Sequence, residues 1–172
     1  TMVRSISTRL KSTRSICEKL ERLGQPVSLV SMHEHLFDLA GIRVVCSYID
    51  DIYVLKNWLA YNTPLRMVNV KDYIQNPKES GYRSLHIILQ VRHEPSGQYL
   101  NVELQLRTMA MDSWAALEHQ MRYKKGKVVS EEISQELYDC ARTLYESDLK
   151  MQKIHRLLSV PALSEESKPS EP

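Results

Sequence analysis

The chain has 172 residues, of which 42% are hydrophobic and 26% are charged, and its formal net charge is +2. This length and composition predict one folded domain with a filled core rather than a disordered chain. A net charge so close to zero argues against a surface that attracts nucleic acid over its whole area, so an anion site must come from a local cluster of cations.

The cysteines and the apolar runs indicate the compartment. Cys17, Cys46 and Cys140 are far apart and odd in number, which argues against a disulfide scaffold or a zinc site. No apolar run approaches the ~20 residues that cross a bilayer, and no signal peptide is visible. These features predict a protein of the reducing cytoplasm that does not associate with a membrane.

The first half of the chain predicts helices and strands in alternation. Residues 5–22 predict a helix, because apolar side chains recur there at helical spacing and Gly24 follows. Residues 42–48 form an apolar, β-branched run that is typical of a buried strand. A helix capped by Asp50 or Asp51 is then expected to reach residue 61, and residues 65–71 predict the next strand.

The second half predicts a hairpin followed by two helices. Strands are expected at 84–92 and 99–107, around a turn at 94–97, and helices at 109–125 and 131–158. We expect residues 1–160 to be a single domain and the Ser-, Glu- and Pro-rich residues 161–172 to be a disordered tail. This order of elements predicts an α+β (mixed α/β) fold, in which helices flank a mixed sheet.

The loop between the strands at 65–71 and 84–92 gathers groups that bind nucleotides. Lys71 and Lys78 can contact phosphates, and Tyr82, beside the turn residue Gly81, offers a stacking face to a base. His86 begins the next strand. A basic surface loop without a ligand is the alternative.

Two carboxylates lie where neighbouring strands could bring them together. Asp38 precedes the strand at 42–48, and Glu103 lies within the strand at 99–107. If these strands are adjacent, the pair could hold Mg²⁺, which is usually bound by one or two carboxylates and substrate phosphates. The alternative is that Asp38 caps a turn and that Glu103 lies on a solvated face.

Cations also cluster near the start of the chain, and two histidines follow. Arg9, Lys11 and Arg14 are expected on the first helical turns, where they could bind a polyphosphate or could be balanced by nearby glutamates on a solvated helix. The pair His33 and His35 could suggest a metal site, but without further nearby ligands it favours a solvated loop.

The order of these motifs resembles the RelA/SpoT family of alarmone synthetases, and in particular its short, synthetase-only branch. The resemblance covers roughly residues 9–125. It is carried by Asp38-Leu39-Ala40-Gly41-Ile42-Arg43-Val44-Val45, by residues 71–86, by Val102-Glu103-Leu104-Gln105-Leu106-Arg107-Thr108, and by Trp114-Ala115, Glu118-His119 and Tyr123-Lys124. It implies a nucleotidyltransferase-like fold with roughly five strands, and a helical segment before residue 5 that this chain would lack.

The resemblance also implies roles for single residues. Asp38 would bind Mg²⁺, and Glu103 would bind the metal or activate the acceptor hydroxyl. On the donor side, Arg9 and Arg43 would flank adenine and Lys11 would contact the phosphates of ATP. Weaker assignments to the donor are Arg14, Lys19 and Arg22. For the acceptor, the implied residues are Tyr82 against guanine, Lys78 and His86 at the 5′ phosphates, Lys71 nearby, and Gln105, which shares a strand face with Glu103.

The implied reaction transfers pyrophosphate from ATP to the ribose 3′-hydroxyl of GDP or GTP and gives AMP and the alarmone ppGpp or pppGpp. The chain contains no GxxxxGK[ST] or GxGxxG loop and no His-Asp dipeptide of the family's hydrolase domain. Transfer to an adenosine nucleotide or to the tRNA 3′ end, or a non-catalytic nucleotide- or RNA-binding module, are the alternatives. A homotetramer is expected from the family; RNA binding is not indicated.

Overall fold

The computed structural model describes residues 1–95, 97–125 and 130–159, and within them the chain forms a five-stranded mixed sheet with helices around it. The elements are β1 (Val3–Leu10), α1 (Thr13–Arg22), α2 (Leu29–His35), β2 (Ala40–Cys46), α3 (Ile49–Asn62), β3 (Arg66–Asp72), β4 (Leu85–Arg92), β5 (Tyr99–Thr108), α4 (Met109–Lys125) and α5 (Glu131–Ser159). The tail predicted at 161–172 lies outside the described residues.

The strand order is β1-β2-β5-β4-β3. β2 and β5 are parallel, and every other neighbouring pair is antiparallel. This arrangement confirms the predicted α+β fold. It also confirms that the strands following Asp38 and containing Glu103 are adjacent, with Gly41 opposite Glu103 in the register.

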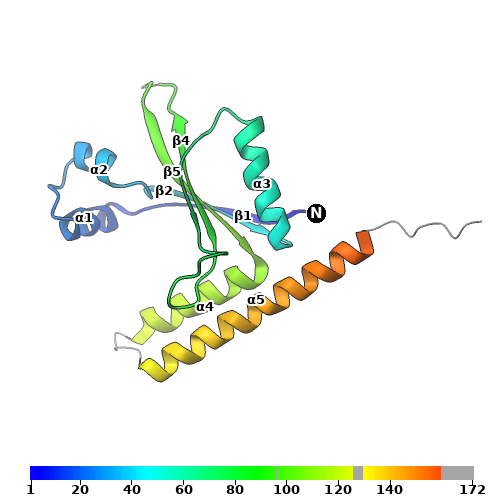
Figure 1. Cartoon of the computed structure of the whole chain (residues 1–172). Coiled ribbons are helices and arrows are strands. Elements are labelled where there is room, and N and C mark those ends of the chain that lie inside the picture. Colours follow the sequence, from blue (N-terminus) through cyan, green and yellow to red (C-terminus); the bar gives the residue numbers. More distant parts are fainter. Residues whose placement is uncertain (96, 126–129, 160–172) are drawn as a thin grey trace, which may run out of the picture.

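Successive side chains along each strand point to opposite faces of the sheet, so one face forms the core and the other carries polar side chains. Leu85, Ile87 and Leu89 of β4 are buried together with Leu104 and Leu106 of β5 in the main core. The alternate residues point to the other face. Figure 1 shows α3 on one side of the sheet and α1 and α2 on the other, so the polar face is the one on the side of α1 and α2.

The helix predicted over residues 5–22 is wrong in its first half, because residues 3–10 form the edge strand β1. This segment contains β-branched Val3, Ile6 and Thr8, pairs antiparallel with β2 and gains a ladder of hydrogen bonds. The helix begins only at Thr13, where the Ser15 amide donates to Ser12 Oγ (3.3 Å). Arg9 therefore lies on the sheet, opposite Gly41.

The loop predicted around His33 and His35 is also wrong, because both residues lie in α2. Ser28 caps this short helix by accepting a hydrogen bond from the Ser31 amide (3.1 Å). The cap satisfies a backbone donor that would otherwise be left unpaired at the helix start.

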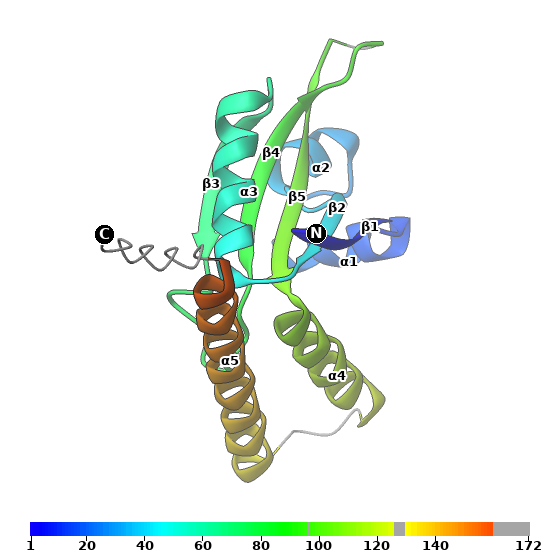
Figure 2. The same ribbon diagram turned by 90° about the vertical axis from the view of Figure 1, so that its right-hand side faces the viewer.

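α4 and α5 form a helical hairpin beneath the sheet (Figure 2). Between them lies a second core formed by Trp114, Ala115, Leu137 and Ala141, in which the Trp114 indole N–H donates to the Leu137 carbonyl (3.0 Å). No helix in the described ranges is both long enough and apolar enough to cross a bilayer.

Candidate active site

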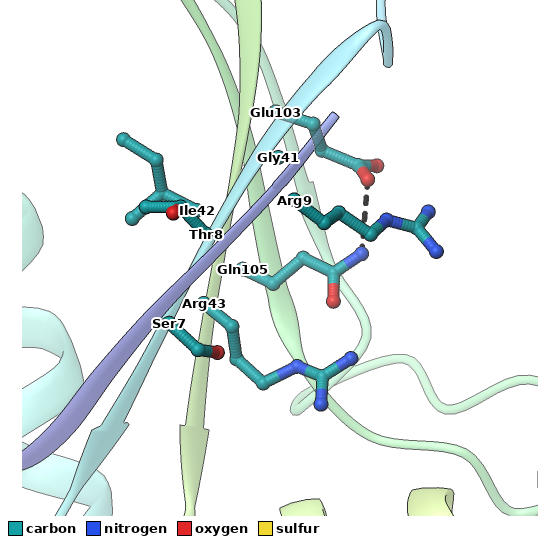
Figure 3. Close-up of a pocket in the computed structure, with 8 residues that line it drawn as sticks. All are labelled: Ser7, Thr8, Arg9, Gly41, Ile42, Arg43, Glu103 and Gln105. Carbon is teal, nitrogen blue, oxygen red and sulfur yellow. Dashed lines mark hydrogen bonds between the residues drawn. The ribbon is translucent and has the colours of Figure 1, made fainter. Parts of the chain in front are cut away.

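Two clefts open on the polar face of the sheet. The first has a volume of about 160 Å³ and is formed by β1, β2 and β5. Its lining residues are Ser7, Thr8, Arg9, Gly41, Ile42, Arg43, Glu103 and Gln105. Figure 3 shows Arg9, Arg43, Gln105 and Glu103 extending to the same side of the strands.

The two arginines of the first cleft come from neighbouring strands. Arg43 forms an ion pair through Nη1 with Asp112 of α4 (3.3 Å), and its buried Nε has no hydrogen-bond partner among the described residues. Arg9 crosses Gly41, where an added Cβ would lie 3.5 Å from Arg9 Cγ. The two planar guanidinium groups can pack on an aromatic base, and the buried Nε of Arg43 is a donor that a ligand could satisfy.

The second cleft is larger, with a volume of about 500 Å³, and is lined by residues of α1, α2, β3, β4 and β5 and of the loops before β2 and after β3. Cations and aromatic groups line it together with two carboxylates. The lining residues are Lys19, His35, Phe37, Asp38, Val68, Asn69, Lys71, Tyr73, Lys78, His86, Ile88 and Glu103. This combination suits a nucleotide that carries several phosphates.

Glu103 lines both clefts. Its carboxylate accepts hydrogen bonds from His86 Nδ1 (3.1 Å) and from Gln105 Nε2 (2.9 Å). The hydrogen bond from His86 is the main cause that holds the pKa of Glu103 below its ordinary value, against the opposing effect of burial. Glu103 is therefore an ionised, oriented carboxylate where the clefts meet.

Asp38 lies in the second cleft and binds two lysines. Lys11 Nζ is 2.6 Å from Asp38 Oδ2, and Lys19 Nζ is 2.7 Å from Asp38 Oδ1. Burial alone would raise the pKa of Asp38, but the two lysine hydrogen bonds outweigh burial and lower it. Asp38 is therefore ionised at neutral pH.

The two carboxylates fit a Mg²⁺ site that is completed by substrate. They line one cleft, and the charge of Asp38 acts to raise the pKa of Glu103, which reflects their proximity. Among the described residues, no group of three or more His, Cys, Asp and Glu side chains could hold a metal ion. A pair of carboxylates is nevertheless what Mg²⁺ needs when phosphate oxygens supply other ligands.

Tyr82 is fixed through its hydroxyl group rather than exposed to the second cleft. The hydroxyl accepts from Arg107 Nη2 (2.6 Å) and lies 2.8 Å from His86 Nε2. Because the ionised Glu103 carboxylate can only accept, His86 donates from Nδ1, and its Nε2 faces the Tyr82 hydroxyl. A chain of hydrogen bonds thus runs from Arg107 through Tyr82 and His86 to Glu103.

The Lys78 ammonium lies between two tyrosine rings. It is 4.8 Å from the ring centroid of Tyr73 and 4.9 Å from that of Tyr82. Of these two tyrosines, Tyr73 lines the second cleft. The Lys78 ammonium thus lies against the half-buried Tyr82 ring on which a base was expected to stack, and Tyr73 offers a second aromatic surface that the sequence interpretation did not assign.

The structure brings together most of the residues selected from the sequence. Arg9, Arg43 and Gln105 lie in the first cleft, and Lys71, Lys78, His86 and Asp38 lie in the second, with Glu103 in both. Lys11 contacts Asp38 at the edge of the second cleft. Arg14 is not brought to either cleft, because its side chain is 88% exposed and pairs with Glu18 one turn along α1 (2.8 Å).

The sequence interpretation passed over several residues that line or support the clefts. Lys19 had only a weak motif assignment, and His35 had been interpreted as part of a solvated loop. Asp112, which pairs with both Arg43 and Arg107 Nη1 (2.9 Å), comes from the first turn of α4. Its position two residues before Trp114-Ala115 was the one signal that could have selected it.

Comparisons with known proteins agree with this geometry. Residues 8–128 match the family described as the region found in RelA/SpoT proteins. The chain is 44% identical over 146 residues to the GTP pyrophosphokinase YwaC of Bacillus subtilis, covering 84% of this chain and 70% of that protein. It is 34% identical over 151 residues to YjbM, a second GTP pyrophosphokinase of the same species, covering 87% and 70%.

Solved structures show the same fold. The small alarmone synthetase 1 of Bacillus subtilis bound to its product pppGpp aligns with a TM-score of 0.83 and 32% identity, over 92% of this chain and 81% of that one. The small alarmone synthetase 2 of Bacillus subtilis aligns with a TM-score of 0.81 and 41% identity, over 91% and 82%. The chain belongs to the RelA/SpoT family, as its motifs predicted.

Proposed function

We propose that this protein is a GTP pyrophosphokinase, which transfers pyrophosphate from ATP to the 3′-hydroxyl of GDP or GTP and releases AMP. The observation that carries the proposal is that one ionised carboxylate, Glu103, lines both clefts. Group transfer between two nucleotides requires a point where donor and acceptor meet, and Glu103 occupies the boundary between a cleft for each.

The donor would bind in the first cleft, with adenine against the guanidinium groups of Arg9 and Arg43. Its phosphates would extend toward the ammonium groups of Lys11 and Lys19, which neutralise charge on the transferred group. The acceptor would occupy the second cleft. Its 5′ phosphates would lie near Lys71 and Lys78, and its base would stack against an aromatic surface.

In the reaction, the 3′-hydroxyl oxygen attacks the β-phosphorus of ATP, and the bond between that phosphorus and the oxygen of AMP breaks. Glu103 would accept the hydroxyl proton, while Gln105 and His86 hold its carboxylate in position by the hydrogen bonds described. Alignment and electrostatic stabilisation would supply most of the rate, as is general in phosphoryl transfer.

We assign the metal position to Asp38 and Glu103. Mg²⁺ held there with the donor phosphates would neutralise negative charge on the transferred pyrophosphate. In this proposal the lysines bind phosphates, Arg9 and Arg43 bind the adenine base, and Glu103 accepts the proton of the 3′-hydroxyl.

We further propose that the protein works in the cytoplasm as a homo-oligomer. Support for the cytoplasm comes from Cys17, Cys46 and Cys140, which are free thiols. Support for self-association comes from α5, on which Met151 and Leu157 are among several exposed apolar side chains that a second copy could cover.

The test is incubation of the purified protein with Mg²⁺ and ATP labelled at the β-phosphate, with GDP, GTP, GMP, an adenosine nucleotide or tRNA supplied separately. We expect labelled guanosine tetra- or pentaphosphate and an equal amount of AMP with GDP or GTP. Label on an adenosine nucleotide or on tRNA would instead assign the alternative acceptors. Absence of transfer to every acceptor would refute the enzymatic function.

A further inference from the structure

The cluster formed by Lys11, Lys19 and Asp38 has more positive than negative charge. Each oxygen of the one carboxylate is in contact with a different ammonium group, at 2.6 and 2.7 Å. The three side chains are between 17% and 25% exposed. Partly buried charges interact more strongly than charges on the open surface, so this arrangement is a stable state of the free protein.

The same carboxylate is the residue assigned to the metal. A divalent cation would need an oxygen of Asp38 at about 2.0–2.1 Å, where an ammonium group now lies against each oxygen. The net charge of +1 on the cluster opposes the attraction that the nearby Glu103 carboxylate exerts on a cation. The two ammonium groups attract a polyphosphate, which carries the anionic oxygens that could replace the carboxylate as their partner.

We propose that Lys11 and Lys19 close Asp38 to divalent cations in the free protein, and that the donor polyphosphate takes these lysines as its own partners and thereby opens Asp38. Cation and donor then bind cooperatively, and the cation binds weakly without the donor. The inference rests on the proposed function in one respect, since it takes ATP as the ligand that supplies the polyphosphate.

The proposal predicts opposite effects of one substitution under two conditions. Without a divalent cation, Asp38 competes with the donor phosphates for the lysines, so Asp38→Asn should strengthen donor binding. With excess Mg²⁺, Asp38 helps to hold the cation that binds the donor, so the same substitution should weaken donor binding. Reciprocity of the two binding equilibria requires that the donor raise the affinity for the cation by the same factor as the cation raises the affinity for the donor.

Calorimetric titration of the full chain with the α,β-methylene analogue of ATP measures both effects without turnover, because the bond that would break is replaced. In EDTA we expect Asp38→Asn to bind the analogue on the order of tenfold more tightly than the original protein, and in excess Mg²⁺ on the order of tenfold less tightly. Glu146→Gln is the matched control for the loss of one negative charge. It removes an exposed carboxylate of α5 that lines neither cleft, so in EDTA it should change the affinity by less than about threefold.

Direct cation binding gives an independent readout. The electron paramagnetic resonance signal of free Mn²⁺, recorded with protein and no nucleotide, should show that Lys19→Met binds Mn²⁺ on the order of tenfold more tightly than the original protein. Lys78→Met is the control for a general change of charge, because Lys78 lines the same cleft but contacts tyrosine rings. Circular dichroism and thermal melting would establish that each variant is folded.

Two results would overturn the proposal. One is an Asp38→Asn protein that gains no affinity for the analogue in EDTA beyond that of Glu146→Gln. The other is a Lys19→Met protein that binds Mn²⁺ no more tightly than Lys78→Met. If the original protein still forms labelled product, the proposed function stands and this inference alone fails. If it forms none, the function fails.

Discussion

Gly81 lies in the loop between β3 and β4 and packs against α5, so its replacement by alanine should disturb both the loop and the helix. Its φ of +85° is in the region that residues with a Cβ rarely adopt. A Cβ at this position would lie 2.7 Å from Ala141 Cβ and 3.3 Å from the Tyr138 ring. The next residue is Tyr82, which packs against the second core, so a shift of the loop would move the Tyr82 hydroxyl that contacts His86.

The expected cost has two parts. A Cβ in the left-handed region costs roughly 1–2 kcal/mol, and overpacking against α5 costs roughly 1–3 kcal/mol. Part of this is offset by the lower entropy of the unfolded alanine chain, about 0.4–1 kcal/mol. The net loss for Gly81→Ala is roughly 2–4 kcal/mol, which corresponds to a fall in Tm of roughly 5–12 °C for a domain of this size.

Gly97 provides the matched control. It also has a positive φ, +68°, but an added Cβ there would meet no atom within 4 Å in the part of the chain that the structure describes. Thermal melting and urea titration of both variants should show that Gly97→Ala loses at most about 1.5 kcal/mol. Adding Ala141→Gly should restore part of the stability of Gly81→Ala, because it removes the contact at 2.7 Å. Equal losses in the Gly81 and Gly97 variants would refute the packing explanation.

Two further predictions follow from the pKa values of buried groups. Burial raises the pKa of the Cys46 thiol to about 11. At pH 8, iodoacetamide should therefore modify exposed Cys140 in the native protein and leave Cys46 unmodified. Mass spectrometry that finds both cysteines modified at equal rates would contradict this prediction. Burial also raises the pKa of Asp148, although a hydrogen bond from Thr108 acts to lower it. At pH values above the ordinary pKa of an aspartate, the ionised Asp148 side chain therefore destabilises the folded state. Asp148→Asn should therefore raise the Tm at pH 7, with a gain that shrinks as the pH falls to about 4, and a gain that grows on acidification would contradict it.

The strands with strong side-chain patterns could be predicted from sequence. The alternation of buried Leu85, Ile87 and Leu89 with polar neighbours identified β4 to within one residue, because it depends only on the period of two. The edge strand β1 could not be predicted in this way. Most of its side chains are exposed, so no apolar alternation competes with the helical spacing that leads into α1.

The residue types of the site could be predicted more easily than their contacts. Asp38 and Glu103 were selected from motifs, but their sharing of one cleft depends on the parallel pairing of β2 with β5, which are far apart in the chain. The contact of Lys19 with Asp38 depends on how α1 and α2 fold back toward β2. Local sequence patterns contain no information on either arrangement. Family motifs contain such information, but only for the positions that the family uses.

The central claim is that Glu103 accepts the proton where the two clefts meet, and the most direct test separates turnover from binding in Glu103→Gln. We expect its kcat for GDP to fall by about 10²–10⁴, the usual contribution of a general base. Its affinities for GDP and for the α,β-methylene analogue of ATP should change by less than about tenfold. Glu146→Gln, on an exposed position of α5, should retain full turnover. Retained turnover in Glu103→Gln, or a loss of binding as large as the loss of turnover, would contradict this role.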